Sequence, residues 1–133
     1  METTSKRYSK QRECILRILS GTTSHPTANW IYDHVREEIP NISLGTVYRN
    51  LSNLSQDGAI MRLDVGDGTD RFDANFHPHY HFYCQECRNL LDMELPYDSA
   101  LDSLAEHAYG AKIAWHNLIF YGCCADCQST EKE

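Results

Sequence analysis

The sequence lacks long apolar runs, and no stretch approaches the roughly 18 residues that a membrane-spanning helix requires. Its first ten residues, METTSKRYSK, also lack the hydrophobic segment of a secretory signal peptide. We therefore expect a cytoplasmic protein with no membrane partner. Basic residues are scarce as well, since 12 Lys and Arg face 19 Asp and Glu for a net charge of −7. That balance by itself argues against a nucleic-acid partner.

The charge is unevenly distributed, and this distribution reverses the argument. Residues 1–66 hold eight basic against seven acidic side chains, and five of the eight lie in the first seventeen residues. Residues 67–133 hold four basic against twelve acidic side chains, together with five of the six cysteines and five of the seven histidines. We expect a half with a basic leading edge joined to an acidic half rich in metal-type ligands.

The first half predicts three helices followed by a β-hairpin. Apolar residues recur at helical spacing in segments 7–21, 25–40 and 41–58, where Thr27 and Ser43 are expected N-caps and Gly58 an expected C-terminal stop. Segments 59–65 and 69–74 read as strands around the turn 66–68. This order is typical of a winged helix-turn-helix, within an α+β fold class.

The second half predicts a mixed α/β domain. Residues 79–84 and 89–95 read as short strands, 99–110 as a helix ended by Gly110, and 111–122 as a further strand. We expect Leu101, Leu104 and Ala108 to face inward, and residues 128–133 to form a frayed tail. The predicted organisation is a DNA-binding-type domain at 1–66, a hinge or turn at 67–70, and a second domain at 71–133.

Two CxxC units, Cys84 with Cys87 and Cys124 with Cys127, form the strongest local signal. Two-residue spacing lets both thiolates of a pair bind one ion, and two pairs complete a closed tetrahedral site for structural Zn²⁺. A disulfide framework is disfavoured without secretion, and a redox CxxC normally occurs once. Cys123 could replace Cys124 only by breaking the spacing, and Cys14 is expected to be a packed core residue.

A second cluster of possible ligands contains imidazoles and carboxylates: Asp73, His77, His79, His81 and Asp92, with His25 upstream. In a strand, His79 and His81 point to the same face and can converge on one ion. Such ligands suit Fe²⁺, Mn²⁺ or Zn²⁺, although an exposed polar loop with incidental histidines remains an alternative. His34, His107 and His116 are interpreted as structural.

The third predicted helix presents a polar face that can contact DNA bases. That face is expected to carry Thr46, Tyr48, Arg49, Asn50 and Asn53, with phosphate contacts from basic residues of the first helix, Lys6, Arg7, Lys10 and Arg12. An ordinary solvated surface is the alternative. Enzyme motifs are absent, because neither HxE nor HExxH occurs, so we expect no enzyme. A non-enzymatic structural zinc-binding interaction module is the rival class.

Together these segments resemble the ferric uptake regulator (Fur) family of metal-responsive repressors. The resemblance is carried by HPTA at 25–28, ISLGTVYRNL at 42–51, DRFD at 70–73, HYHFYCQEC at 79–87 and YGCCADC at 121–127. It implies a homodimeric repressor that binds double-stranded operator DNA through a winged helix and dimerises through the C-terminal domain. It also implies structural zinc on the four CxxC cysteines, and a regulatory Fe²⁺ or Mn²⁺ site formed by His25, Asp73, His79, His81 and Asp92.

Within the family, Asp at position 92 resembles the peroxide-sensing subgroup, in which Fe²⁺ and peroxide oxidise ligand histidines that match His25 and His79. Arg49 instead resembles the iron- and zinc-uptake regulators, which are the alternative. An additional metal site that some iron sensors build around HDH is not reproduced, because Tyr80 replaces its carboxylate.

Overall fold

The computed structural model describes the backbone of residues 4–131 and the side chains of residues 9–128. Its chain divides into two compact units, Met1–Phe76 and His77–Glu133. Residues 67–69 of the expected hinge or turn at 67–70 form the tip of a hairpin inside the first unit, and Asp70 begins the second strand of that hairpin. The second strand of that hairpin pairs with the first, so residues 71–76 stay with the helices rather than joining the second unit.

Three helices begin the first unit: α1 (Thr4–Ser20), α2 (Ala28–Val35) and α3 (Leu44–Gln56). The predicted caps are confirmed, because Thr27 accepts the Trp30 N–H and Ser43 accepts the Thr46 N–H. Gly58 follows α3 with φ +75°, a left-handed conformation that glycine adopts without strain. The helix α2 is shorter than segment 25–40 suggested, since turns already follow its end at Val35.

The core of the first unit is one apolar cluster shared by the three helices and the hairpin. Its fully buried members include Ile15, Ile31, Val47, Leu51 and Phe72. Burying such a side chain contributes about 1.5–3 kcal/mol, so the cluster holds α3 firmly against α1 and α2.

The hairpin consists of β1 (Met61–Asp64) and β2 (Asp70–Asp73), paired antiparallel. The Phe72 side chain is fully buried, while its N–H donates to the Pro26 carbonyl at 3.0 Å. This contact fixes the end of β2 beside the segment that precedes α2. The predicted winged helix-turn-helix arrangement of three helices and a hairpin is therefore present.

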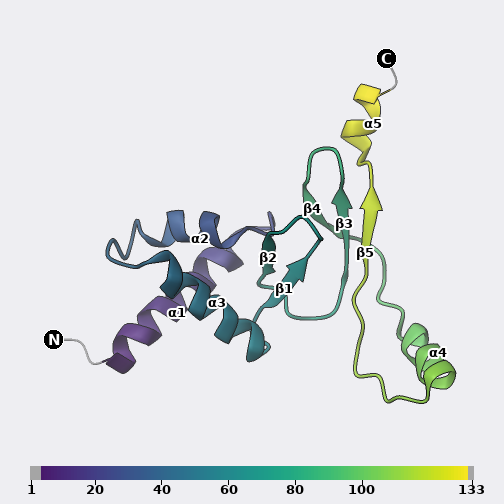
Figure 1. Ribbon diagram of the computed structural model, residues 1–133, viewed down its shortest axis with the longest axis horizontal. Coiled ribbons are helices and arrows are strands. Elements are labelled where there is room, and N and C mark those ends of the chain that lie inside the picture. Colours follow the sequence, from purple (N-terminus) through teal and green to yellow (C-terminus); the bar gives the residue numbers. More distant parts are fainter. Residues whose placement is uncertain (1–3, 132–133) are drawn as a thin grey trace. The chain divides into compact units, whose positions relative to one another are not determined.

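A three-stranded sheet in the order β4-β3-β5 forms the centre of the second unit (Figure 1). Its strands are β3 (Tyr80–Cys84), β4 (Leu90–Met93) and β5 (Ile119–Gly122). The strands β3 and β4 are antiparallel, whereas β5 lies parallel to β3 and is much shorter than segment 111–122 suggested. The parallel arrangement requires a crossover, which contains α4 (Ser99–Tyr109).

The helix α4 differs from its sequence-based expectation. It ends at Gly110 with φ +80°, as predicted, and it begins after the cap Asp98, but its residues, all of them described, include none that is buried. Leu101 and Leu104 were expected inside and are 38 % and 67 % exposed. The apolar residues of α4 do recur at helical spacing, but the apolar face that they form is not covered by the three-stranded sheet of the same chain.

The chain end is ordered differently from the expected tail. The described residues finish with α5 (Ala125–Glu131), which includes the first four residues of segment 128–133. Among residues 4–131, no helix has both the length and the apolar character needed to cross a membrane.

Candidate metal centres

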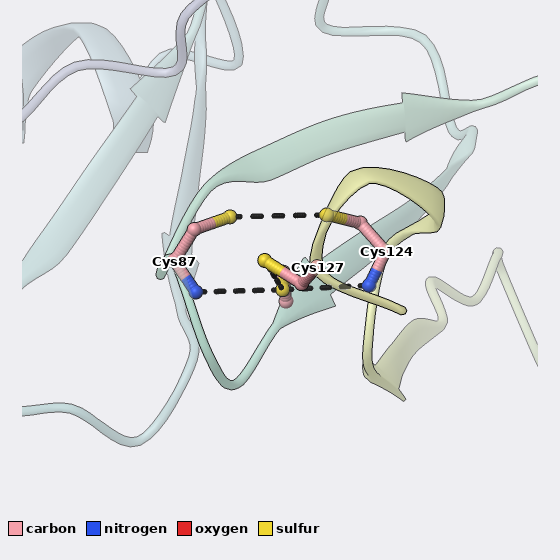
Figure 2. A group of neighbouring side chains, drawn as sticks. Cys87, Cys124 and Cys127 are labelled. Carbon is pink, nitrogen blue, oxygen red and sulfur yellow. Dashed lines mark hydrogen bonds between the residues drawn. The ribbon is translucent and has the colours of Figure 1, made fainter. Parts of the chain in front are cut away.

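The four CxxC cysteines lie together in the second unit (Figure 2). Cys84 ends β3, Cys87 follows in the turn to β4, Cys124 follows β5, and Cys127 lies in α5. The Sγ atoms are 3.7 Å apart between Cys84 and Cys127, and 4.0 Å apart between Cys87 and Cys124. All four Sγ atoms lie within 4.8 Å of one another. Zn–S bonds of about 2.3 Å give tetrahedron edges of about 3.8 Å, so this cluster has the dimensions of a Zn²⁺ site.

Backbone amides prepare this cluster for a cation. The N–H groups of Cys87 and Cys124 both donate to Cys84 Sγ, at 3.5 and 3.4 Å, and they lower the pKa of Cys84 to about 6. The neighbouring Cys124 thiol has the opposite effect on Cys127, whose pKa is raised. Four thiolates at this separation repel one another, and a divalent cation removes that repulsion. The residues present therefore fit structural zinc.

The remaining two cysteines lie outside this cluster. Cys123 donates its thiol to the Cys124 carbonyl, so the two-residue spacing of Cys124 and Cys127 is retained. Cys14 is buried in α1, as predicted, where burial and a hydrogen bond to Glu38 raise its pKa to about 11. The six cysteines, all within the described range, are free thiols.

The first unit holds one histidine–carboxylate pair. His25 precedes α2, is 2 % exposed and places Nε2 3.1 Å from Asp73 Oδ2 at the end of β2. His25 has φ +52°, which is uncommon for a residue with a side chain and more so before a proline. Such outliers cluster at functional sites, where surrounding structure maintains them. Here the contact between Phe72 and Pro26 maintains the pair.

The second unit holds a group of three donors. His79 lies just before β3, and His81 within β3 is the register partner of Asp92 on β4. The two Nε2 atoms lie 3.0 and 3.4 Å from the same Asp92 Oδ1 atom. His79 Nδ1 lies 2.7 Å from the His77 carbonyl oxygen, which leaves Nε2 as the nitrogen that faces Asp92. His77 thus acts through its backbone, and its ring remains exposed.

Each unit therefore presents an incomplete imidazole–carboxylate set. The first offers one nitrogen and one oxygen, and the second offers two nitrogens and one oxygen. Donors of this kind suit Fe²⁺, Mn²⁺ or Zn²⁺ rather than a thiolate-type structural site.

Two further histidines, His34 and His116, have structural partners. His34 Nδ1 lies 2.8 Å from the Trp30 carbonyl oxygen. His116 is held between Asp102 Oδ1 at 2.7 Å and the Tyr80 hydroxyl at 2.8 Å, so the residue that replaces the HDH carboxylate is its partner. The sequence predicted a structural role for His116 but did not identify these two partners, because Asp102 and Tyr80 are distant in the chain and only the fold brings them together.

The polar face of α3 is largely as expected. Tyr48, Arg49 and Asn53 are exposed, and Thr46 is half-buried. Asn50 is a correction, since it is only 8 % exposed and its Nδ2 donates to the Thr46 carbonyl at 3.0 Å. It follows Val47 by three residues and precedes Leu54 by four, and it therefore falls on the buried stripe.

Of the four basic residues of α1 that are predicted to contact phosphates, two have described side chains, Lys10 and Arg12. Lys10 is exposed, and Arg12 forms an ion pair with Asp57 at 3.2 Å. The side chains of Lys6 and Arg7 lie outside those described. Leu44 is half-buried, unlike Val47, Leu51 and Leu54, because it is the first residue of α3.

Comparisons with known proteins agree with this geometry. The model of the ferric uptake regulator family matches residues 3–121. The peroxide-responsive repressor PerR of Staphylococcus aureus (strain USA300) is 38 % identical over 122 residues, covering 92 % of this chain and 82 % of that protein. The Campylobacter jejuni peroxide stress regulator superposes with a TM-score of 0.78 at 25 % identity, covering 96 % of this chain and all of that one.

A second solved structure is also similar to this chain. The Helicobacter pylori ferric uptake regulator Fur, described as having three functional metal binding sites, superposes with a TM-score of 0.76 at 25 % identity. The match covers 90 % of this chain and 80 % of that one. These relatives are transcriptional regulators and not enzymes, and the family model spans most of the sequence. The chain belongs to the ferric uptake regulator family.

Proposed function

We propose that this protein is a metal-dependent, DNA-binding transcriptional repressor that senses peroxide through oxidation of a ligand histidine. The observation that carries the proposal is the convergence of His79 Nε2 and His81 Nε2 on one oxygen of Asp92. The identity of that carboxylate matters, because the family resemblance associates Asp at this position with peroxide sensing. The 38 % identity to a peroxide-responsive repressor supports the same subgroup.

The regulatory ion would be Fe²⁺ or Mn²⁺, held by donors from both units. Neither the pair His25–Asp73 nor the group of His79, His81 and Asp92 fills a coordination sphere alone, whereas all five donors together would supply three imidazoles and two carboxylates and would leave room for peroxide to bind. An ion shared in this way would fix one unit on the other, and its loss would release them. Moving a two-state population from 1:99 to 99:1 requires about 5.5 kcal/mol of preferential binding.

The DNA contact would be made by α3 in the major groove. Tyr48 and Arg49 are exposed there, and Arg is the side chain most often used to read guanine. Repressors of this type bind as dimers to half-sites at a fixed spacing, so fixing the two units restores the spacing of the recognition helices. We place the protein in the cytoplasm, where operator DNA is found.

Structural zinc on the four CxxC cysteines would support a homodimer. Bound zinc would join the end of β3, the following turn and the chain after β5, and would thereby stabilise the three-stranded sheet. The exposed apolar side chains Leu101, Leu104 and Trp115 are then available to a second copy of the chain.

Iron, when bound, supplies one-electron chemistry toward peroxide. The chain's own residues determine where the oxidation falls: imidazoles within bonding distance of the ion are the nearest oxidisable groups. Overall, one peroxide molecule adds one oxygen atom to a ring C–H of His25 or His79 and the other oxygen leaves as water. An oxidised ring binds metal poorly, so repression ends without reversal.

The test is operator binding with Fe²⁺, Mn²⁺ or Zn²⁺, each measured before and after a brief exposure to micromolar peroxide. We expect the Fe²⁺ form to lose DNA binding and to gain about 16 Da, one oxygen atom, on the peptide containing His25 or His79, while the Mn²⁺ form is unchanged. Iron-loaded protein that stays unmodified and DNA-bound would indicate the iron- or zinc-uptake regulator, with the same site residues. Zinc-loaded protein with no metal-dependent DNA binding would indicate the structural interaction module.

A further inference from the structure

A polar cavity of about 510 Å³ lies in the first unit between α1 and the beginning of α3. It is lined by Lys10, Gln11, Ile39, Asn41, Ile42, Ser43 and Thr46. One cation and several hydrogen-bonding groups line this cavity, called here the α1–α3 pocket, and no acidic side chain is among its described lining residues. Such a lining favours an anion.

The beginning of α3 adds hydrogen-bond donors to this pocket. Ser43 caps the Thr46 N–H, and the Val47 N–H donates to the Ser43 carbonyl. The N–H groups of Leu44 and Gly45 have no acceptor among the residues that the structure describes. Helix N-termini attract anions through such amides and through the helix dipole.

Gln11 is the observation that distinguishes this pocket from an ordinary helix end. It is only 9 % exposed, and its Oε1 atom has no hydrogen-bond partner within the described part of the chain. A buried polar atom without a partner destabilises the folded protein. Gln11 lines the pocket, so its amide lies beside any ligand held there. A half-turn about the last side-chain bond exchanges oxygen and nitrogen and presents N–H donors to an anion.

We propose that the α1–α3 pocket binds one phosphodiester group of the operator backbone, held by Lys10, the Gln11 amide and the first amides of α3. This inference rests on the proposed DNA binding and deepens it. Tyr48 and Arg49 lie one turn further along α3, so a phosphate held at the helix start sets the register of the side chains that read bases. Gln11 is then a positioning residue for recognition, although it is distant in sequence from the recognition helix.

The experiment compares wild-type protein with Gln11→Glu, Gln11→Met and the control Gln56→Met. Gln56 is exposed at the far end of α3. Affinities are measured on operator duplexes in which single phosphates are replaced by uncharged methylphosphonates, over a range of salt concentrations. Thermal unfolding of each variant checks that the helices remain folded.

We expect one position in each half-site at which methylphosphonate weakens wild-type binding by about tenfold or more. Gln11→Glu should bind the unmodified operator at least tenfold more weakly, with a slope of log K against log salt reduced by about 0.9, and should be insensitive to methylphosphonate at that position. Gln11→Met should weaken binding with the salt slope unchanged, and Gln56→Met should resemble wild type. Identical methylphosphonate profiles for wild type and Gln11→Glu would overturn the proposal.

A second measurement does not depend on operator binding. Titration with inorganic phosphate, followed by NMR, should shift the Gly45 amide in wild-type protein and not in Gln11→Glu. If the Gly45 amide shifts with phosphate but the protein binds no operator, the proposed function is contradicted, whereas anion binding in the α1–α3 pocket is supported. An unmoved Gly45 amide in a protein that binds operator would contradict the pocket alone.

Discussion

Asp92 is the residue on which the proposed peroxide sensing depends most directly. It lies on β4 opposite His81, and a single oxygen of its short side chain meets two imidazole nitrogens at 3.0 and 3.4 Å. Its carboxylate stands one methylene nearer the backbone than that of a glutamate at the same position. Side-chain length therefore controls where the carboxylate oxygen meets the histidines, and in the proposed mechanism it also controls the access of peroxide to the site.

Replacement of Asp92 by Glu tests this dependence. We expect Asp92→Glu to lose most of the iron-dependent oxidation while keeping metal-dependent DNA binding, because a carboxylate remains and only its geometry changes. Mass spectrometry of the His25 and His79 peptides after peroxide exposure measures the first effect, and operator binding measures the second. The Mn²⁺-loaded form of each protein serves as the control. Oxidation of Asp92→Glu at the wild-type rate would contradict the assignment.

Cys84 is the corresponding residue of the zinc centre, because two backbone amides lower its pKa and neighbouring thiols surround it. We expect Cys84→Ser to lose stoichiometric zinc and the dimer, since metal binding at a closed site contributes to folding free energy. Cys123→Ser is a matched control that should keep both, as Cys123 lies outside the cluster. Metal analysis and light scattering supply the readouts. Stoichiometric zinc in a dimeric Cys84→Ser protein would refute this ligand set.

At the scale of elements, α3 combines two faces with separate roles. Val47, Leu51 and Leu54 are fully buried and anchor the helix in the core, while Tyr48 and Arg49 remain exposed. Asn50 belongs to the anchored face, where it donates to the helix backbone. Successive residues of a helix project about 100° apart, so the side chains proposed to read DNA lie on a different face of α3 from those that anchor it.

This separation predicts different effects for two adjacent substitutions. Arg49→Ala should cost about 1–3 kcal/mol in operator binding and relax specificity at one position of each half-site. Asn50→Ala should leave the ratio of operator to random-sequence affinity unchanged. Binding titrations against a set of single-base operator variants measure both effects. An equal loss on operator and random DNA for Arg49→Ala would assign that side chain to the phosphate backbone instead.

At the scale of the whole molecule, the second unit exposes more apolar surface than an isolated domain normally keeps. Leu91, Leu95, Leu104, Trp115 and Phe120 are each at least 40 % exposed, and none of the described residues of α4 is buried. Covering such surfaces is a common reason for symmetric dimers. In the single chain, the second unit therefore leaves apolar side chains exposed that a second copy could bury.

A charge placed on this surface should separate the copies. We expect Leu104→Asp to convert the proposed dimer to a species near the 15.3 kDa chain mass, because a buried, unpaired carboxylate is costly at an interface. Ser103→Asp, at a position that is also exposed on the same helix, is the control and should remain dimeric. Analytical ultracentrifugation with zinc present measures the difference. A dimeric Leu104→Asp protein would exclude α4 from the interface.

Local interactions explain the features that sequence reasoning predicted well. The caps Thr27 and Ser43, the left-handed glycines Gly58 and Gly110, and the apolar spacing of α3 depend on residues within a few positions of one another. The CxxC spacing likewise selected the four cysteines that the structure brings together. Such features are encoded by neighbouring residues, so they can be read without the fold.

Only the tertiary structure decided which distant residues meet and which faces are covered. Pairing of β2 with β1 moved the boundary between units past the expected hinge, and β5 joined β3 in parallel. The partners of His116, and the meeting of Gln11 with the start of α3, join segments 14 or more residues apart. Periodicity gives the apolar face of α4, but burial depends on what packs against it. The sequence alone determined the local elements and the metal-type ligands, whereas long-range packing determined their partners, because each such contact depends on the placement of the whole unit.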